Sequence, residues 1–341
     1  LCLFLPEKLF YELSKNSYEL NVYPEKIIEN KHGFIQVYNS HGDQVVFGAN
    51  VYDGKFNTDI FHNTNGIDRA YFLTAIRPKA KDALVIGLST GSWVKVLSMM
   101  PSLEKITVIE INPAYHDLIK SDPAISRILK DRRIEIVFDD GRKWLKKNQN
   151  KKFDIVLMNT TWHWRAYGSN LLSQNFLHLI KSVLNENGVA FYNTTQSIDA
   201  FYTAKQVFPR VYKYKFFVLA SSNQILLSEK DMITSLCELE DPLSKQKIFS
   251  GENQCILAKN EIMKKYAVID IGSNTVRMVV YAVEENDTFH ALFSKKYTLG
   301  LAGYVQDGVM SQEGIHRLCG VLIECRMLMS QFEMERSFVF A

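Results

Sequence analysis

Several features that define common classes of protein are missing from this chain of 341 residues. No apolar run reaches the roughly 18 residues that a membrane-spanning helix needs. The five cysteines include no Cys-x-x-Cys pair, which argues against a zinc ribbon and a disulfide framework, so we expect a reducing compartment. Residues 1–5 are apolar but have no basic flank and no small-residue cleavage site, so they do not resemble a signal peptide.

A strong net charge is also missing. The 40 lysines and arginines nearly balance the 37 aspartates and glutamates, and the resulting charge of +3 is too small to indicate binding to nucleic acid or to a membrane surface. We therefore expect no nucleic-acid partner. Hydrophobic residues make up 47% of the chain and charged residues 23%, as in ordinary globular proteins, and the length predicts roughly two domains.

The residue pattern divides the chain into four expected regions. They are an N-terminal helix and β-hairpin region (1–80), a Rossmann-like nucleoside-binding domain (81–228), a polar linker or tail (229–262) and a C-terminal module (263–341). In the first region, two β-branched runs at 34–38 and 44–47 predict a hairpin with a four- to five-residue loop, and 67–76 predicts a helix.

The second region alternates short apolar runs with helical stretches. The expected strands are 83–86, 106–109, 134–138, 153–158 and 189–193. This alternation is typical of right-handed βαβ units, so the sequence predicts an α/β fold with a doubly wound parallel sheet. Such sheets bind ligands beyond the carboxyl ends of their strands.

Three clusters of candidate binding residues follow successive strands of this region. The expected nucleoside-binding residues are Gly87, Ser89, Gly91, Glu110, Asp139 and Asp140. Glycines after the first strand let the backbone turn sharply and approach a ligand. A carboxylate that ends the second strand can accept hydrogen bonds from ribose hydroxyls, and one after the third strand can accept from an adenine amino group. A glycine turn or a strand-end acid alone is a weak signal, but their order and spacing together favour a nucleoside site.

These clusters carry a resemblance to a known family. From about residue 25 to residue 228, the chain resembles the spermidine synthases, which are polyamine aminopropyltransferases with a methyltransferase-like Rossmann fold and a small N-terminal β region. The resemblance implies decarboxylated S-adenosylmethionine as donor, or S-adenosylmethionine itself, since methyltransferases share the fold. It also implies a small-molecule amine or other acceptor, and we expect a homodimer.

The segment after the fourth strand departs from the family pattern. Asn159 and Trp162 stand where the family has two acidic residues that hold and deprotonate the attacking amine. Asparagine can neither take a proton nor neutralise a polyamine cation, so the sequence argues against aminopropyl transfer to a polyamine. Two interpretations stay open: a transferase that acts on another acceptor, and a nucleoside-binding module without catalysis.

The same loop offers other candidates for catalysis. We take Asn159, His163 and Arg165 as the candidate catalytic residues, with His163 as a general base and Arg165 as a binder of an anionic substrate. The alternative is that His163 makes a structural hydrogen bond while neighbouring tryptophans cover the pocket. The chain begins with Leu1 rather than methionine, so we expect an upstream part to be missing. The protein is then expected in the cytoplasm, or at the cytoplasmic face of the inner membrane if that part spans the membrane.

The C-terminal module contains the most specific motif of the chain. The candidate phosphate-binding residues are Asp270, Gly272, Ser273, Asn274 and Thr275, with Asp270 also the candidate magnesium ligand. The module resembles the start of the exopolyphosphatase and guanosine pentaphosphate phosphohydrolase family, which implies an incomplete actin-like (ribonuclease H-like) ATPase domain. The alternative is a plain β-hairpin. Because the family's catalytic glutamate and second phosphate loop would lie further downstream, we expect no hydrolase activity from residues 263–341, whether the module is a native fusion or part of an adjacent coding region.

Overall fold

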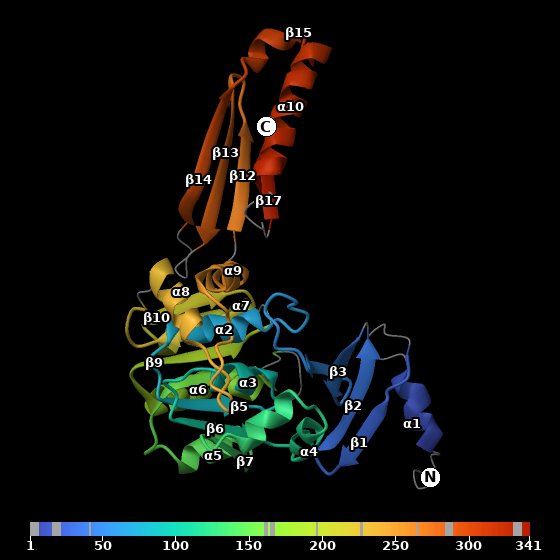
Figure 1. Cartoon of the computed structure of the whole chain (residues 1–341), viewed down its shortest axis with the longest axis vertical. Coiled ribbons are helices and arrows are strands. Elements are labelled where there is room, and N and C mark those ends of the chain that lie inside the picture. Colours follow the sequence, from blue (N-terminus) through green and yellow to red (C-terminus); the bar gives the residue numbers. More distant parts are fainter. Residues whose placement is uncertain are drawn as a thin grey trace. The chain divides into compact units, whose positions relative to one another are not determined.

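A computed structural model describes residues 7–15, 22–40, 42–159, 163, 168–195, 197–225, 228–263, 265–283, 289–329 and 336–341. The chain divides into two compact units, Leu1–Ala258 and Lys259–Ala341. Each unit is described below by itself (Figure 1).

The first unit begins with a helix and a small antiparallel sheet. These elements are α1 (Glu7–Ser14), β1 (Lys26–Asn30), β2 (Gly33–Ser40), β3 (Asp43–Gly48) and β4 (Val51–Lys55). The strands pair in the order β1-β2-β3-β4, which confirms the predicted hairpin between β2 and β3. Pairing extends to Ser40 and Asp43, so the connection is shorter than the expected four to five residues. Tyr38, Val45 and Phe47 form a buried cluster on one face of this sheet.

A seven-stranded sheet forms the centre of the first unit. Its strands are β5 (Asp82–Ile86), β6 (Lys105–Glu110), β7 (Ile134–Phe138), β8 (Phe153–Met158), β9 (Leu184–Asn193), β10 (Arg210–Tyr214) and β11 (Phe217–Ser221). They lie in the order β10-β11-β9-β8-β5-β6-β7, and β9, β8, β5, β6 and β7 run parallel. The chain moves outward from β5 through β6 to β7 and then returns to add β8 on the other side of β5. The topological switch point therefore lies between β5 and β8, where such sheets bind ligands.

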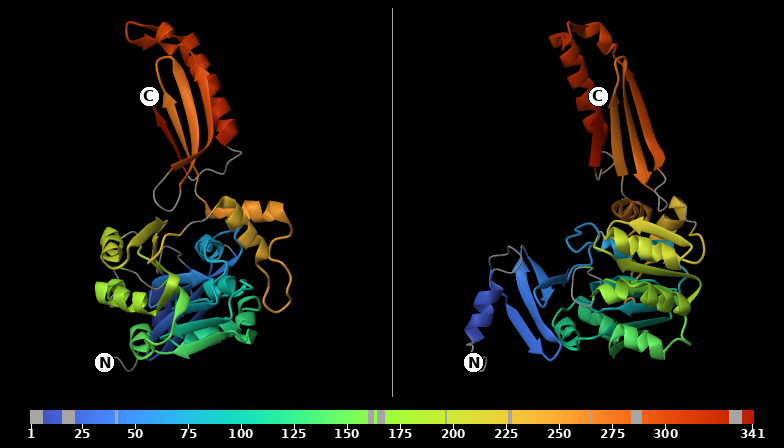
Figure 2. Two further views of the ribbon diagram at one scale, coloured as in Figure 1. Left: turned by 90° about the vertical axis from the view of Figure 1, so that its left-hand side faces the viewer. Right: turned by 180° about the vertical axis from the view of Figure 1, so that it is seen from behind.

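Helices cover both faces of this sheet (Figure 2). They are α2 (Asp68–Ile76), α3 (Ser92–Ser98), α4 (Ala114–Lys120), the 3₁₀ helix η3 (Ile125–Lys130), α5 (Gly141–Lys147), the 3₁₀ helix η4 (Gly168–Leu172), α6 (Gln174–Val183) and α7 (Ile198–Val207). Apolar side chains of α5, α6 and α7 pack with alternate residues of β5, β8, β9 and β11 in the main core. The strands β5, β6 and β8 are almost fully buried, which explains why each is a continuous apolar run in the sequence. None of the helices among the described residues is long and apolar enough to cross a membrane.

The segment expected as a linker contains two helices, α8 (Glu229–Glu238) and α9 (Glu252–Ile262). Ser228 caps α8, because its hydroxyl accepts a hydrogen bond from the Asp231 backbone N–H in a capping box. Cys237 and Cys255 form a disulfide that joins the two helices. This pair corrects the expectation that the chain has no disulfide. The two cysteines are 18 positions apart in the sequence, and this spacing alone does not reveal that two helices bring them together.

The second unit contains a four-stranded sheet and a long helix. Its elements are β12 (Lys265–Ile271), β13 (Thr275–Val283), β14 (Phe289–Thr298), the 3₁₀ helix η5 (Leu301–Tyr304), β15 (Val305–Gln306), β16 (Val309–Met310), α10 (Gln312–Met329) and β17 (Arg336–Phe340). The strand order is β14-β13-β12-β17, with β17 parallel to β12. Ile269, Val276, Met278 and Val280 face Cys325 of α10 in one buried cluster. The predicted strands and the helix of this module are thus confirmed, whereas its actin-like character stays a prediction.

Candidate functional site

The glycine-rich turn between β5 and α3 has an unusual backbone. Gly87, Ser89 and Gly91 have φ angles of 95°, 49° and 76°, all in the left-handed region. Glycine adopts such angles without the steric cost that a Cβ atom brings, which explains two glycines in five residues. The Gly87 N–H donates to the Ile109 carbonyl at 2.8 Å, so the turn is tied to the neighbouring strand β6.

Gly91 serves packing rather than lining a cavity. A Cβ atom at this position would lie 2.9 Å from the Ile119 Cδ1 atom and 2.9 Å from the Ile125 Cγ2 atom. The absence of a side chain therefore lets the start of α3 approach α4 and η3 closely. The expected nucleoside-binding role of Gly91 stays a prediction, since the residues that line the cavities described below do not include it.

This packing gives a first testable prediction. We expect Gly91→Ala to lower the free energy of unfolding of the first unit by roughly 2–3 kcal/mol, because it combines a strained φ with an overpacked core. All four tryptophans lie in residues 1–258, so tryptophan fluorescence during urea unfolding follows this unit. Gly251→Ala is the control for the effect of the φ angle alone. Gly251 has a φ of 88°, but a Cβ atom added there would have no neighbouring atom within 4 Å. Equal losses in the two variants would contradict the packing role.

Glu110 ends β6 and is deeply buried. One carboxylate oxygen accepts the Leu88 N–H at 2.7 Å and the other accepts the Asn112 N–H at 2.8 Å. The side chain thus joins the glycine turn to the end of β6. Burial raises the pKa of Glu110, and the backbone N–H donors partly oppose that shift. The Ser89 and Ile111 N–H groups also act as donors to this carboxylate, so backbone groups of the glycine turn and of the end of β6 surround it.

The two aspartates after β7 have different local partners. Asp140 caps α5, because one of its oxygens accepts the Lys143 N–H at 2.7 Å. Asp139 accepts the Asp140 N–H at 2.9 Å, and its own N–H donates to the Glu110 carbonyl at 3.2 Å. Both aspartates are therefore fixed in place beside the end of β6.

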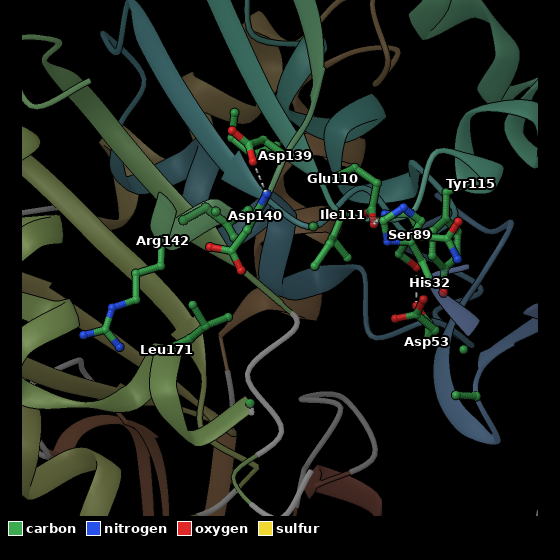
Figure 3. A pocket seen from close by; sticks show the side chains of 18 of the residues that line it. His32, Asp53, Ser89, Glu110, Ile111, Tyr115, Asp139, Asp140, Arg142 and Leu171 are labelled. Carbon is green, nitrogen blue, oxygen red and sulfur yellow. Dashed lines mark hydrogen bonds between the residues drawn. The ribbon is translucent and has the colours of Figure 1, made fainter. Parts of the chain in front are cut away.

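These residues surround a cavity of about 540 Å³, which we call the outer cavity. Its lining includes Gly87, Ser89, Glu110, Asp139 and Asp140, so five of the six expected nucleoside-binding residues come together there. The small sheet adds His32 from the turn between β1 and β2, and Asp53 from β4. Figure 3 shows His32, Asp53, Ser89 and Tyr115 at one end of the cavity and Asp140, Arg142 and Leu171 toward the other. The volume lies within the range of small-molecule sites.

A second, smaller cavity adjoins the outer one, and we call it the inner recess. It has about 20 Å³ of space, enough for roughly one water-sized group. It is lined by Asp53, Gly54, Asn65, Val85, Gly87, Leu88, Ser89, Thr90, Trp93, Leu157 and Asn159. Asp53, Gly87 and Ser89 belong to both cavities, so these three residues mark the junction between them.

Asn159 follows β8 at the switch point and is held by the end of β9. The Thr195 backbone N–H donates to the Asn193 Oδ1 atom at 2.8 Å, and the Asn193 Nδ2 atom donates to the Asn159 Oδ1 atom at 3.2 Å. The Nδ1 atom of His163 contacts the Thr195 hydroxyl. His163 is exposed and is not among the residues that line either cavity. Its role as a base stays a prediction, and Arg165 and Trp162 lie outside the described residues.

Some lining residues were not predicted from the sequence. His32, Asp53 and Asn65 come from the N-terminal 80 residues, which we expected to form only a hairpin region. Asn112 connects this region to the end of β6, because its Oδ1 atom accepts a hydrogen bond from the Asn30 Nδ2 atom at 2.7 Å. The adjacent Asp53 and Gly54 within the short strand β4 were the one local signal that could have drawn attention to this part of the chain.

The candidate phosphate turn of the second unit is a compact loop. Its Gly272 N–H donates to the Thr275 carbonyl at 2.8 Å, while the Ser273 and Asn274 carbonyls accept from backbone N–H groups of residues 299–302. Asp270 lies exposed near the end of β12. Among the described residues, no group of three or more His, Cys, Asp or Glu side chains could hold a metal ion. Phosphate binding and magnesium binding at this turn stay predictions.

Comparisons with known proteins agree with the first resemblance. Residues 71–227 match a family model described as the spermine/spermidine synthase domain. A polyamine aminopropyltransferase of Alkaliphilus oremlandii is 29% identical over 116 residues, which is 34% of this chain and 40% of that protein. The polyamine aminopropyltransferase of Clostridioides difficile is 30% identical over 139 residues, or 38% of this chain and 49% of that protein. The aligned segments thus span less than half of either relative.

Solved structures show the same fold. A spermidine synthase in complex with the transition-state analogue AdoDATO aligns with a TM-score of 0.52 at 18% identity, over 70% of this chain and 87% of that chain. The spermidine synthase of Thermotoga maritima aligns with a TM-score of 0.51 at 17% identity, over the same shares. The first unit therefore contains a spermidine synthase-like domain with the predicted Rossmann-like methyltransferase fold.

Proposed function

We propose that the first unit is a transferase that takes an alkyl group, aminopropyl or methyl, from an adenosine sulfonium donor. Decarboxylated S-adenosylmethionine and S-adenosylmethionine are the two candidate donors. One observation carries the proposal: the glycine turn, Glu110 and the Asp139–Asp140 pair line a single cavity at the carboxyl ends of β5, β6 and β7. The acceptor is a small molecule.

The side chains of the outer cavity fit such a nucleoside. Glu110 accepts hydrogen bonds from the ribose hydroxyls beside the backbone N–H groups that already hold its two oxygens in place. Asp139 and Asp140 accept from the adenine amino group at the far end. When bound, the donor supplies an electrophilic carbon attached to a positive sulfur. The carboxylates of the cavity favour that positive charge over a neutral ligand of the same shape.

Isothermal titration calorimetry tests the proposal. We expect S-adenosylmethionine, its decarboxylated form or methylthioadenosine to bind the full chain with a dissociation constant in the micromolar range, which corresponds to about −8 kcal/mol. Adenosine lacks the sulfur substituent and serves as a weaker-binding comparison. If none of the three sulfur nucleosides binds, the proposal is wrong.

A nucleoside-binding module without catalysis is the second candidate. It is favoured by Asn159, a neutral amide at the end of β8 whose oxygen already accepts from Asn193. The two candidates differ in turnover. Release of a thioether nucleoside from a bound donor in the presence of any acceptor supports the transferase, and binding without release supports the module.

A further inference from the structure

We propose that the acceptor of this transfer is a carboxylate, which presents a negatively charged oxygen in the inner recess. The inference rests on the proposed function, because it concerns the second substrate of the same site. The attacking oxygen of the acceptor lies in the recess, and the Asn159 amide selects the acceptor.

The position of the recess suits an attacking atom. Asp53, Gly87 and Ser89 line both the outer cavity and the recess. An alkyl group that leaves the nucleoside at this junction points into the recess. Room for roughly one water-sized group admits the attacking atom of an acceptor but not the rest of the acceptor molecule.

Hydrogen bonding fixes which way the Asn159 amide faces. A backbone N–H can only donate, so the atom of Asn193 that faces the Thr195 N–H at 2.8 Å must be its oxygen. The Asn193 amino group therefore faces Asn159, and the atom that it meets at 3.2 Å must be the Asn159 oxygen. With its oxygen turned to β9, Asn159 has its amino group left to offer to the recess that it lines. An N–H donor there binds a lone pair of the acceptor and repels an ammonium group.

The proton balance of the reaction favours the same class of acceptor. An amine, a hydroxyl or an ordinary thiol is mostly protonated at pH 7 and needs a base, whereas a carboxylate with a pKa of about 4 is already ionised. Its oxygen lone pair forms the new O–C bond, and the C–S bond electrons return to sulfur. The products are an alkyl ester and a neutral thioether, and no proton moves.

The surrounding charges are consistent with an anion. Arg69 lies against the recess wall, with its guanidinium carbon 5.4 Å from the ring centre of the recess residue Trp93. Arg69 does not itself line the recess, and the neighbouring Asp68 carboxylate interacts electrostatically with its guanidinium group. Asp53 is the one carboxylate among the described residues of the recess lining, and it lies at the junction, where the positive sulfur of the donor passes. Asp53 thus suits the cationic donor, and Arg69 adds positive charge behind the Trp93 wall of the recess.

Thioether release provides the test. The full chain is incubated with S-adenosylmethionine or its decarboxylated form, and the thioether nucleoside is measured by liquid chromatography with propionate, succinate or putrescine present. We expect propionate or succinate to raise release at least 10-fold over donor alone, and putrescine to raise it less than 2-fold. The inference is wrong if putrescine raises thioether release as much as the carboxylates do. It is also wrong if the donor binds but neither propionate nor succinate raises thioether release.

Variants connect the effect to the amide. We expect Asn159→Asp to lose at least 10-fold of the carboxylate stimulation and to gain stimulation by putrescine. Asn187→Asp adds the same charge near the opposite end of β9, where the Asn187 oxygen accepts from Asn223, and it should behave as the wild type. Calorimetry separates the two proposals. If the wild type does not bind a donor, the proposed transferase function is wrong. If it binds a donor but prefers another acceptor, only the proposal of a carboxylate acceptor is wrong.

Discussion

Glu110→Gln is expected to weaken methylthioadenosine binding at least 100-fold, which corresponds to about 2.7 kcal/mol. Both oxygens of Glu110 already accept a backbone N–H, one from Leu88 and one from Asn112. A glutamine has only one oxygen, so its amino group must face one of these N–H donors. The result is an unsatisfied buried donor beside the glycine turn and the loss of two hydrogen bonds that a charged acceptor makes to the ribose.

The pH dependence of binding adds an independent check. Ribose hydroxyls donate to the ionised carboxylate, so binding requires Glu110 to be deprotonated. Because burial raises the pKa of Glu110, affinity of the wild type should fall at a higher pH than an exposed glutamate would show. The raised pKa also means that this group favours the folded state below its unfolded pKa and loses that contribution as pH rises through the folded value. The glutamine variant should show neither dependence.

Glu135→Gln is the matched control for this experiment. Glu135 lies on the adjacent strand β7, is exposed, and forms a surface ion pair with Lys105 at 2.7 Å. We expect its affinity for methylthioadenosine to stay within 2-fold of the wild type. Wild-type affinity in Glu110→Gln would show that the ribose does not lie at Glu110 and would remove the main support for the transferase.

Local patterns were sufficient to predict the five parallel strands of the central sheet, but not the antiparallel strands β10 and β11. The strands β5, β6 and β8 are almost fully buried, so each appears in the sequence as a short apolar run, and helices of ordinary length separate the predicted strands. Parallel strands bring their carboxyl ends to one edge, which is why Gly87, Glu110 and Asp140 could be placed in one site without coordinates.

Contacts between distant segments could not be predicted in the same way. Asp53 and Asn65 reach the inner recess because the small sheet packs beside the glycine turn, where the Thr90 hydroxyl donates to the Lys55 carbonyl at 3.0 Å. The expected binding residue Gly91 follows the same glycine pattern as Gly87, but it meets isoleucines of α4 and η3 instead of a cavity. The role of each of these residues depends on which distant segment of the chain packs against it. A single sequence does not show which segments pack together.

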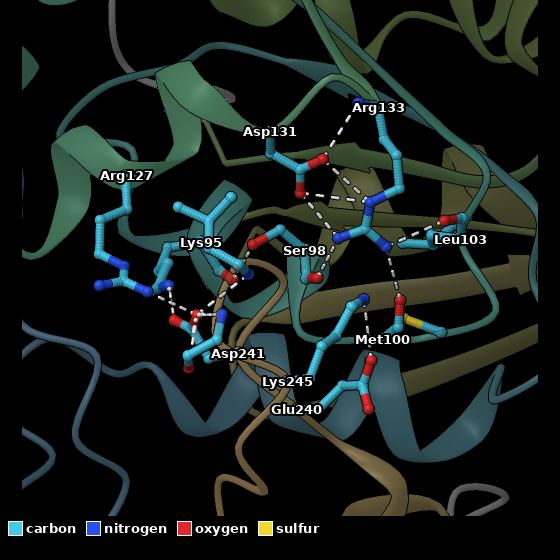
Figure 4. Close-up of polar contacts among 12 residues, drawn as sticks. Lys95, Ser98, Met100, Leu103, Arg127, Asp131, Arg133, Glu240, Asp241 and Lys245 are labelled. Atoms are coloured by element: carbon cyan, nitrogen blue, oxygen red, sulfur yellow. Dashed lines mark hydrogen bonds and ion pairs between the residues drawn. The ribbon is translucent and has the colours of Figure 1, made fainter.

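A second contact between distant segments joins α3, η3 and the loop between α8 and α9 (Figure 4). Asp241, in the loop between α8 and α9, accepts from the Lys95 Nζ atom of α3 at 3.0 Å and from an Arg127 guanidinium nitrogen of η3 at 2.6 Å. It also accepts the Ser244 N–H at 2.8 Å. The Lys95 side chain is only 8% exposed. Asp241 therefore anchors the C-terminal part of the first unit to the helix that follows the glycine turn.

Asp241→Ala is expected to lower the free energy of unfolding of the first unit by roughly 3 kcal/mol, because it leaves the buried Lys95 ammonium without its counter-charge. Urea unfolding followed by tryptophan fluorescence measures the loss. The partners of Asp241 hold its pKa well below the usual value, so its contribution is complete above the unfolded pKa of about 4 and decreases as pH falls below it. The difference between wild type and Asp241→Asn should therefore narrow below about pH 4.

The exposed pair of Lys81 and Glu104 provides the control for this effect. Their charged groups lie 2.8 Å apart, but the side chains are 65% and 66% exposed, so Glu104→Ala should cost less than about 1 kcal/mol. A loss in Asp241→Ala no larger than in Glu104→Ala would mean that the loop between α8 and α9 does not hold α3. A large loss would show that α3, and the glycine turn before it, are held by a carboxylate that lies 241 − 95 = 146 positions further along the chain. The ion pair between Lys95 and Asp241 makes this connection.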